Sequence, residues 1–319
     1  MLKPKKFVVS HAPFWHDDSN VSERHYHIIL ATLPAVLFGL FQYGGPAVGV
    51  ISLSVSFAIF WELLMNYLTR RPVTIGDGNA ALIGLLFGML LPATSPWWLV
   101  ITGTFVAMVI GKHIFGGIGG NPFNPALIGI AILMLSWKNY FNFDQALVNY
   151  DFGFTTIYPL MAVKYFGTSA IASFSPGGLL LGQQIGGIGS TFGLGLIAAG
   201  IYLMARGFIR WEISLSFLAG ILLSAFLFNL YDASRFAGAG FHLFTGYTLI
   251  GAFFLATEDS SSPVNFIPML IYGAGAGVLT VLIRNIGYYI DGVVFAILIM
   301  NILNPLLDKI RPQAIGKVV

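Results

Sequence analysis

Ten apolar runs, each bounded by glycine, proline or charged residues, follow one another along this chain of 319 residues. They fall at about 28–43, 47–68, 79–92, 97–115, 122–137, 190–206, 211–230, 241–257, 264–283 and 290–307. A helix needs ~20 mostly apolar residues to cross a bilayer, and the runs near 79–92 and 122–137 are shorter than that. Only 9% of the residues are charged, whereas an average soluble domain carries about 25%. The sequence therefore predicts an all-α polytopic membrane protein with about ten transmembrane helices.

The long polar interval 138–189 divides these runs into five and five. An odd number of helices in each half places the halves in opposite orientations, so the pattern predicts two inverted five-helix halves. Asn121-Pro-Phe-Asn-Pro125 is echoed by Asn301-Ile-Leu-Asn-Pro305, although Asn-Pro also simply ends helices. The predicted organisation is an amphipathic N-terminal segment (1–27), a first half (28–137), a loop (138–189), a second half (190–308) and a tail (309–319).

The positions of lysine and arginine predict the orientation. If the N-terminus lies inside, 12 of the 16 basic residues fall on inner loops, and the four on the outer side are Lys138, Lys164, Arg235 and Arg284. Inner loops of membrane proteins carry the excess of positive charge. We therefore expect both termini on the cytoplasmic side, the interval 138–189 on the outer face, and no nucleic-acid partner. The chain has no cysteine, which excludes thiolate-bound iron–sulfur clusters on it.

The segment Gly111–Pro125 is the densest irregular stretch, with five glycines and two prolines. Irregular backbone at membrane depth is tolerated only where it is buried in protein or lines a cavity. The segment is therefore predicted to frame a cofactor or an ion path, with Lys112, Asn121 and Asn124 as candidate cofactor ligands. The alternative is a tight cytoplasmic turn.

Two further sets of residues are candidates. Thr245 and Thr248 share one face of the predicted helix 241–257, where small residues favour a planar ligand or close helix packing. Intramembrane carboxylates are costly, so acidic residues there are candidates for an ion path; these are Glu62, Asp77, Asp291 and Asp308. Only Glu62 is expected to lie deep. The alternatives are interfacial ion pairs and, for Asp77, a helix cap.

Four histidines lie near the start of the chain: His11, His16, His25 and His27. Their spacing fits no standard metal motif, so we expect no metal site.

These stretches together resemble the D subunit of Rnf-type ion-translocating electron-transport complexes. They are similar, more remotely, to the B subunit of the Na+-pumping NADH:quinone oxidoreductase. The segments that carry the resemblance are Gly111–Pro125, Pro96-Trp-Trp98, Arg210-Trp-Glu-Ile-Ser-Leu-Ser-Phe-Leu, His242-Leu-Phe-Thr-Gly with the following Gly-Ala-Phe-Phe, and Asp291-Gly-Val.

The resemblance implies a subunit of an ion-translocating ferredoxin:NAD oxidoreductase, a translocase in which this chain is not catalytic alone. It implies partners that carry iron–sulfur clusters and flavin, coupling to Na+ or H+, and a bacterial or archaeal inner membrane. It also implies FMN joined through its phosphate to a threonine in an outer Ser-x-Ala-Thr-Pro-Leu motif, and a non-covalent riboflavin within the membrane portion.

The chain departs from the family at the attachment motif. The matching stretch reads Thr155-Thr156-Ile157-Tyr158-Pro159-Leu160, so Tyr158 stands where the acceptor threonine is expected. A phenol could stack on a flavin ring or accept the phosphoester, and Thr155 or Thr156 could substitute if the register slips. Two other functions stay open: a flavin-free scaffold subunit of the complex, and a secondary transporter built from inverted repeats.

Overall fold

The structure, a computed structural model, describes residues 20–310, and the regular elements in this range are all helices. The predicted N-terminal segment and the tail therefore lie mostly outside the described residues. The first half consists of α1 (Val21–Tyr43), α2 (Gly45–Leu68), α3 (Asn79–Leu90), α4 (Trp97–Phe105) with a following π-helical turn (Val106–Ile110), and α5 (Pro125–Ser136). The second half consists of α9 (Gly193–Ala205), α10 (Trp211–Tyr231), α11 (Ala239–Phe244), α12 (Thr248–Ile250) with a second π-helical turn (Gly251–Leu255), α13 (Phe266–Asn285) and α14 (Val293–Leu307).

The all-helical membrane architecture predicted from the sequence is confirmed. Five helical stretches among the described residues are long and apolar enough to cross a membrane: Val21–Tyr43, Gly45–Leu68, Trp97–Phe115, Trp211–Tyr231 and Phe266–Asn285. The helices α3, α5, α9 and α14 are also apolar but shorter. α1 begins before the predicted residue 28 because Asn20 caps it, accepting a hydrogen bond from the Glu23 amide at 2.7 Å.

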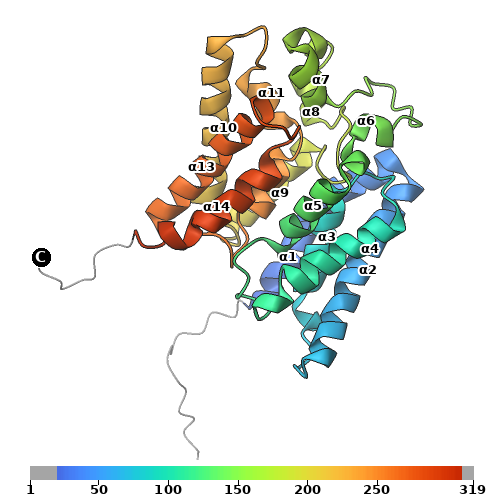
Figure 1. Ribbon diagram of the computed structural model, residues 1–319, viewed down its shortest axis with the longest axis vertical. Coiled ribbons are helices and arrows are strands. Elements are labelled where there is room, and N and C mark those ends of the chain that lie inside the picture. The colour runs from blue at the N-terminus through green and yellow to red at the C-terminus, as the bar shows by residue number, and fades with distance from the viewer. Residues whose placement is uncertain (1–19, 311–319) are drawn as a thin grey trace, which may run out of the picture.

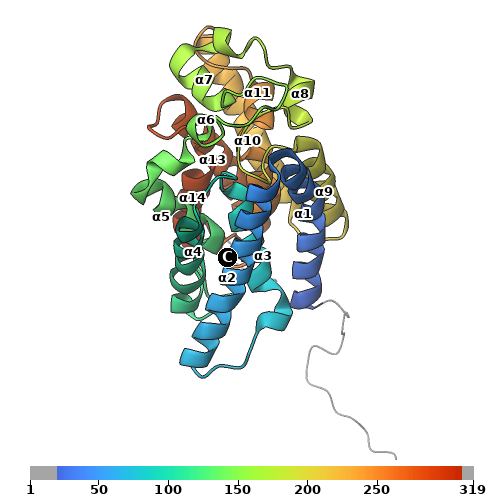
Figure 2. The same ribbon diagram turned by 90° about the vertical axis from the view of Figure 1, so that its right-hand side faces the viewer.

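The two halves use similar helix pairings. In the first half α2 packs on α3 and α4, and α4 packs on α5; in the second half α10 packs on α11 and α13, and α13 packs on α14. The halves meet where α1 contacts α9 and where α5 contacts α14. Figure 1 shows the first half, blue to green, beside the second half, yellow to red, and Figure 2 shows α1 next to α9.

Small residues allow the closest of these contacts. A side chain at Gly277 would place its Cβ 2.2 Å from the Phe217 carbonyl oxygen, and one at Gly273 would meet the Ser216 hydroxyl. Close backbone approach through small residues is typical of helices packed in membranes, where no hydrophobic force drives helices together. The helices α10 and α13 are therefore packed closely against each other in the second half.

The predicted single helix 241–257 is interrupted, which corrects the sequence-based expectation. α11 ends at Phe244, Thr245 is extended, and Gly246 adopts φ +64° before α12 begins. A side chain at Gly246 would bring its Cβ within 2.3 Å of an Asp291 carboxylate oxygen. Glycine both permits the left-handed conformation and leaves room for that carboxylate, so the helix breaks here.

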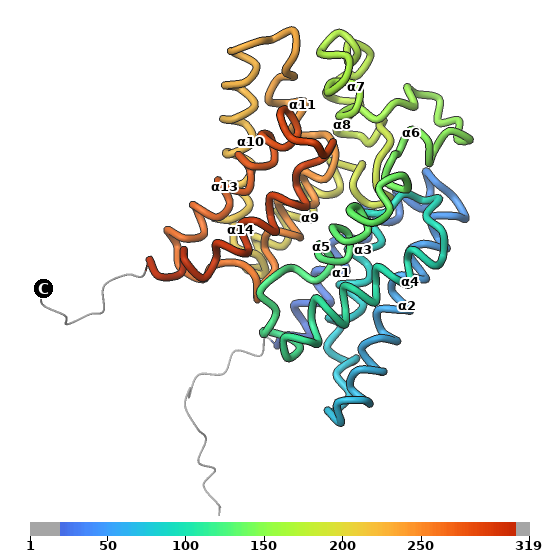
Figure 3. Tube along the Cα trace, in the orientation of Figure 1, coloured from blue at the N-terminus to red at the C-terminus, as the bar shows by residue number. Residues whose placement is uncertain are grey.

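The interval 138–189 is also more ordered than the predicted loop. It contains α6 (Phe143–Ala146), α7 (Pro159–Phe166) and α8 (Pro176–Leu180), with 3-10 turns at Lys138–Phe141 and Thr168–Ile171. These elements lie together across one end of the molecule, at the top of Figures 1 and 3. We call this end the upper face. The lower face is the opposite end, which carries the turns 69–78, 111–124 and 256–265.

Two buried hydrogen bonds fasten the halves to each other. The Tyr247 hydroxyl donates to the Leu90 carbonyl at 2.6 Å, at the end of α3. The Asn124 amide group donates to the Leu255 carbonyl at 3.0 Å, at the end of the second π-helical turn. A side chain of the second half thus donates to the carbonyl at the end of α3. A side chain of the first half donates to the carbonyl at the end of the second π-helical turn.

Candidate cofactor and ion sites

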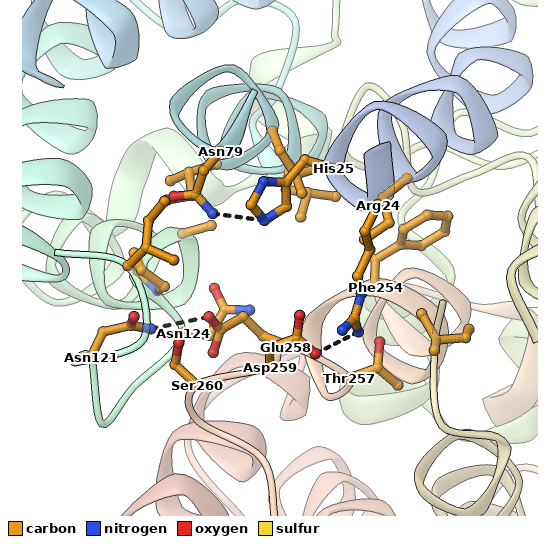
Figure 4. A pocket seen from close by; sticks show the side chains of 18 of the residues that line it. Arg24, His25, Asn79, Asn121, Asn124, Phe254, Thr257, Glu258, Asp259 and Ser260 are labelled. Atoms are coloured by element: carbon orange, nitrogen blue, oxygen red, sulfur yellow. Dashed lines mark hydrogen bonds and ion pairs between the residues drawn. The ribbon is translucent and has the colours of Figure 1, made fainter. Parts of the chain in front are cut away.

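A cavity of about 350 Å3 lies at the lower face between the two halves (Figure 4). Its apolar walls come from α1, α3 and the second π-helical turn, and include Ile28, Leu82, Ile83, Leu86, Phe253 and Phe254. Its polar side chains are Arg24, His25, Asn79, Asn121, Asn124, Thr257, Glu258, Asp259 and Ser260. Ligand pockets are typically concave, mostly apolar and equipped with a few convergent polar groups, and we call this one the lower cavity.

Helix starts bring these polar groups together. Asn124 caps α5 through its side-chain oxygen, which accepts from the Leu127 amide at 3.3 Å. Asn121 lies in the preceding turn and donates to Glu258 at 3.1 Å. On the opposite wall, Asn79 at the start of α3 hydrogen-bonds His25 at 3.2 Å. Asn121 and Asn124 thus line a cavity, while their contact with a cofactor stays a prediction.

An ion pair at the edge of the lower cavity links the halves. Arg24 of α1 lies 2.5 Å from Asp259, while the buried Arg24 Nε has no hydrogen-bond partner among the described residues. Burial raises the pKa of the neighbouring Glu258 carboxyl above its usual value, although Ser261 and Asn121 donate to it. The cavity therefore offers a free N–H donor and a carboxyl that is easily protonated.

Lys112, the third candidate of that segment, lies elsewhere. Its ammonium is buried against Glu62, with Nζ 2.8 Å from Oε2, and His113 Nε2 lies 2.9 Å from the same oxygen. The Thr74 hydroxyl donates to the other oxygen of Glu62 at 2.5 Å. Glu62 is 1% exposed, as predicted for a deep residue. We call these residues the Glu62 cluster. Its basic residues, Lys112 and His113, come from the turn that follows the first π-helical turn.

Asp291 is also buried, which corrects the expectation that only Glu62 lies deep. It is 4% exposed, and Arg284 donates to its Oδ1 at 2.9 Å through a terminal nitrogen. Its carboxylate also accepts from the backbone amides of Tyr247 and Val293, at 2.7 and 3.1 Å. Arg284 donates in addition to the carbonyls of His242 and Thr245. This Asp291 cluster joins the helix break to the start of α14.

The two remaining acidic candidates bind backbone. Asp77 accepts from the Asn79 amide at 2.8 Å, close to the capping role considered for it, although the cap residue itself is Gly78. Asp308 accepts from the Val264 amide at 3.3 Å. The predicted neighbour of Asp308, Arg311, lies outside the described residues.

Thr245 and Thr248 do not form a helical face for a ligand. The Thr245 hydroxyl donates to the Phe241 carbonyl at 2.7 Å, and that of Thr248 to the His242 carbonyl at 2.7 Å. Both side chains are 0% exposed. They stabilise the backbone around the helix break, which is the packing alternative considered for them.

At the upper face, the degenerate attachment motif borders a second cavity, of about 400 Å3, which we call the upper cavity. Its lining is mainly aromatic: Phe141, Phe143, Tyr158, Tyr165, Tyr247, Tyr288 and Tyr289. Tyr158 is 3% exposed and its hydroxyl has no hydrogen-bond partner in the described chain. Burial raises the pKa of this hydroxyl well above its usual value, and the charge of Asp291 adds to the rise. Tyr158 is thus a neutral, buried phenol.

The other motif residues differ in exposure. Thr155 is partly buried, and Thr156 and Ile157 are exposed. Pro159 and Leu160 are buried at the start of α7. The Tyr158 amide donates to the Asp144 carboxylate at 2.6 Å, which anchors the start of that helix. Thr156 is thus accessible from outside, whereas Tyr158 is buried.

The histidines contact protein groups. His25 Nδ1 lies 2.8 Å from the Asp77 carbonyl oxygen, and His27 Nδ1 lies 2.6 Å from the Tyr202 hydroxyl. His11 and His16 lie outside the described residues. Sequence reasoning missed Arg24 and Glu258, because they border the ends of helices that are distant in sequence. The run Thr257-Glu258-Asp259 directly after an apolar segment was the available signal.

Comparisons with known proteins agree with the fold. The sequence model described as "NQR2, RnfD, RnfE family" matches residues 8–316. The D subunit of the proton-translocating ferredoxin:NAD(+) oxidoreductase complex of Clostridium ljungdahlii is 35% identical over 315 residues, covering 97% of this chain and 95% of that protein. The D subunit of the ion-translocating oxidoreductase complex of Cronobacter sakazakii is 33% identical over 347 residues, covering 97% and 99%. That of Pectobacterium atrosepticum is 33% identical over 346 residues, with the same coverage.

Proposed function

The chain belongs to the NQR2, RnfD, RnfE family, and on that premise we propose that it is the D-type membrane component of an ion-translocating ferredoxin:NAD oxidoreductase complex. The names of its relatives support this role, as do its membrane-spanning helices. Because the chain lacks cysteine, thiolate-bound iron–sulfur clusters of the complex must be carried by its partners. The proposed location is the inner membrane, with both termini on the cytoplasmic side.

We further propose that the lower cavity binds riboflavin without a covalent bond. The observation that carries this proposal is the combination of a cavity of about 350 Å3 with two phenylalanines and convergent amide groups. A flavin needs apolar contact on its ring faces and hydrogen bonds along its polar edge, and this lining supplies both. When bound, the flavin supplies the electron-accepting and electron-donating chemistry, while the protein supplies binding and electrostatics.

The residues of the lower cavity then have distinct tasks. Phe253 and Phe254 exclude water and contact the ring. Asn79 and Asn121 orient its polar edge. The unpartnered Nε of Arg24 donates a hydrogen bond and stabilises negative charge on the ligand. Glu258, whose carboxyl pKa is raised, holds a proton near the cavity.

The motif aligns Tyr158 with the threonine that accepts FMN in the family, but burial of the motif residues favours a different acceptor for covalent FMN. The Tyr158 hydroxyl is buried and does not fit attachment by a transferase, so any phosphoester belongs on the more accessible Thr156. If Thr156 is unmodified, the upper cavity lacks a covalent flavin, and the scaffold alternative applies at this face.

Ion coupling is proposed to involve the Glu62 cluster. A carboxylate with two basic partners and a hydroxyl can exchange protons without loss of backbone hydrogen bonds, and deep carboxylates mark ion paths by default. Whether Na+ or H+ moves is decided by measuring translocation in vesicles at fixed pH with and without Na+.

The test is the flavin content of the purified complex. Acid precipitation should release riboflavin from the wild type, and Ala126→Phe, which fills the lower cavity, should reduce the released amount by one equivalent. Ala131→Phe is the matched control, because Ala131 is buried on the same helix but does not line the cavity. Equal release from both variants would refute the site.

Covalent flavin is tested separately, by fluorescence of the chain on a denaturing gel and peptide mass mapping of 138–189. A fluorescent band that survives Tyr158→Phe and disappears in Thr156→Val is the expected result if covalent FMN is present. A band that Tyr158→Phe abolishes would contradict the assignment. A dark band would leave riboflavin as the flavin of this chain.

A further inference from the structure

Three of the four basic residues that the orientation rule leaves on the outer side converge on one small pocket. Lys164 of α7, Arg235 of the turn after α10 and Arg284 of α13 line a pocket of about 20 Å3 at the upper face. His242 and Asn285 complete its polar lining. We call this the cationic pocket. Basic residues are depleted on outer loops, so their gathering at one point needs a local cause.

Carboxylates balance only part of this positive charge. Arg284 is paired with Asp291 at 2.9 Å, and the electrostatic field of Arg235 reaches Asp232 at the surface. Lys164 forms no ion pair within residues 20–310; its ammonium donates instead to the carbonyls of Ile283 and Tyr289. A partly buried ammonium without a counter-ion is unfavourable.

The pocket also contains donors without acceptors. His242 is 1% exposed, and neither of its ring nitrogens has a hydrogen-bond partner in the described part of the chain. The buried side-chain nitrogen of Asn285 is likewise unpartnered. A neutral imidazole carries one N–H, and buried donors are nearly always satisfied by protein, water or ion. The lining therefore presents positive charge and free N–H groups together.

We propose that the cationic pocket binds a single small monovalent anion of the size of chloride. Its volume of about 20 Å3 exceeds the roughly 10–15 Å3 that one water needs and suits a single monatomic anion, whereas a tetrahedral oxyanion is larger. A water would accept from at most two donors and would point its hydrogens at cations. A halide accepts from the free donors of His242 and Asn285 and balances the charge.

The state of Lys164 agrees with this assignment. Without an anion, the pKa of Lys164 is lowered to about 8; burial is the main cause, Asp291 opposes the shift and Lys138 contributes to it. A bound anion would restore the charged ammonium. Because Arg284 also holds the carbonyls of His242 and Thr245, occupancy of the pocket would stabilise the helix break.

The first test uses the purified complex at constant ionic strength. Replacing sodium gluconate by sodium chloride or bromide should raise the melting temperature of this chain with saturation. Sulfate or phosphate should give no saturating increase, since exclusion of these ions from the protein surface stabilises without saturation. Lys164→Met should raise the half-saturating chloride concentration by at least tenfold. Lys309→Met is the matched control, because it removes the same charge at an exposed position that does not line this pocket. An increase that depends only on ionic strength, or that phosphate matches, would overturn the proposal.

The second test needs no variant and does not depend on activity. Anomalous scattering from crystals of the complex grown in bromide should place a peak among Lys164, Arg284 and His242. A pocket that shows only water at bromide concentrations that saturate the thermal effect would overturn the assignment of the anion to this place.

Discussion

The Glu62 cluster and the Asp291 cluster are both buried carboxylates paired with cations, yet they are bound in different ways. Glu62 is held by the side chains of Lys112, His113 and Thr74. Asp291 accepts from two backbone amides as well as from Arg284. The Glu62 cluster can therefore rearrange while the helices stay in place, whereas the Asp291 cluster holds helix ends together.

The identity of the cation sharpens the difference. A buried lysine can release its proton when its partner is lost, but an arginine stays charged under all conditions relevant to proteins. Losing the carboxylate near Lys112 can thus be relieved by deprotonation, while losing it near Arg284 leaves a fixed buried charge. We infer that the first cluster is suited to changes of charge and the second to structural stability.

The largest expected effect is that of Asp291→Asn. Removing one partner of a buried pair costs about 3–5 kcal/mol because the other charge stays uncompensated. We expect poor accumulation of the complex and a strongly lowered melting temperature in detergent, measured by tryptophan fluorescence. Asp151→Asn, at an exposed position of the upper face, should behave as wild type. A stable Asp291→Asn protein would contradict the structural role that distinguishes the Asp291 cluster from the Glu62 cluster.

Gly246→Ala should have the next largest effect. The left-handed conformation costs ~1–2 kcal/mol for a non-glycine residue, and overpacking against Asp291 and Leu160 adds ~1–3 kcal/mol. Gly78→Ala is the control, since Gly78 also has positive φ but its Cβ would meet only side-chain atoms at 3.4 Å and beyond. Because both positions have positive φ, the ratio of the unfolding rates of the two variants measures the cost of the clash with the Asp291 cluster. Equal rates would show that backbone strain alone matters.

Glu62→Gln should lower stability less, by about 1–3 kcal/mol, the cost of leaving buried polar groups imperfectly paired. We expect the complex to assemble and to transfer electrons from ferredoxin to NAD while ion translocation in vesicles is lost. The two activities are measured on the same preparation. Translocation that persists in Glu62→Gln would place the ion path elsewhere.

The smallest effect concerns pH at the upper face, because Lys164 is only partly buried and solvent screens its charge. The pKa of Lys164 is lowered to about 8 in the folded chain, against about 10.4 for a free lysine. Between these values the folded state binds fewer protons than the unfolded state, so this group makes stability rise as pH increases from about 8 to about 10.4. The rise should be absent in Lys164→Met, when melting temperatures are compared in gluconate. A fall over this range would contradict the assigned direction of the pKa shift.

The helices could be predicted well from the sequence, because apolar runs between glycine, proline and charged residues leave a membrane chain few alternatives. Gly246 broke the eighth run unexpectedly, since the reason for the break is a carboxylate far along the chain. The depth of Asp291 was missed for the same reason: its partners, Arg284 and the Tyr247 amide, come from other segments. Asn121 and Asn124 could be chosen as candidates from the sequence, because the Gly- and Pro-rich backbone around them predicts irregular structure at membrane depth. Arg24 and Glu258 were missed because they meet only in the folded chain, and the run Thr257-Glu258-Asp259 was the one local signal for Glu258.

Two of the buried hydrogen bonds between the halves, Tyr247 to Leu90 and Asn124 to Leu255, have a mechanical consequence. A rocking motion of one half against the other would break both and leave two buried carbonyls without donors, at about 1–3 kcal/mol each. The two bonds oppose relative movement of the halves, so the bundle moves as one unit. Any gate that opens during turnover while these bonds stay intact must be a local rearrangement within the bundle.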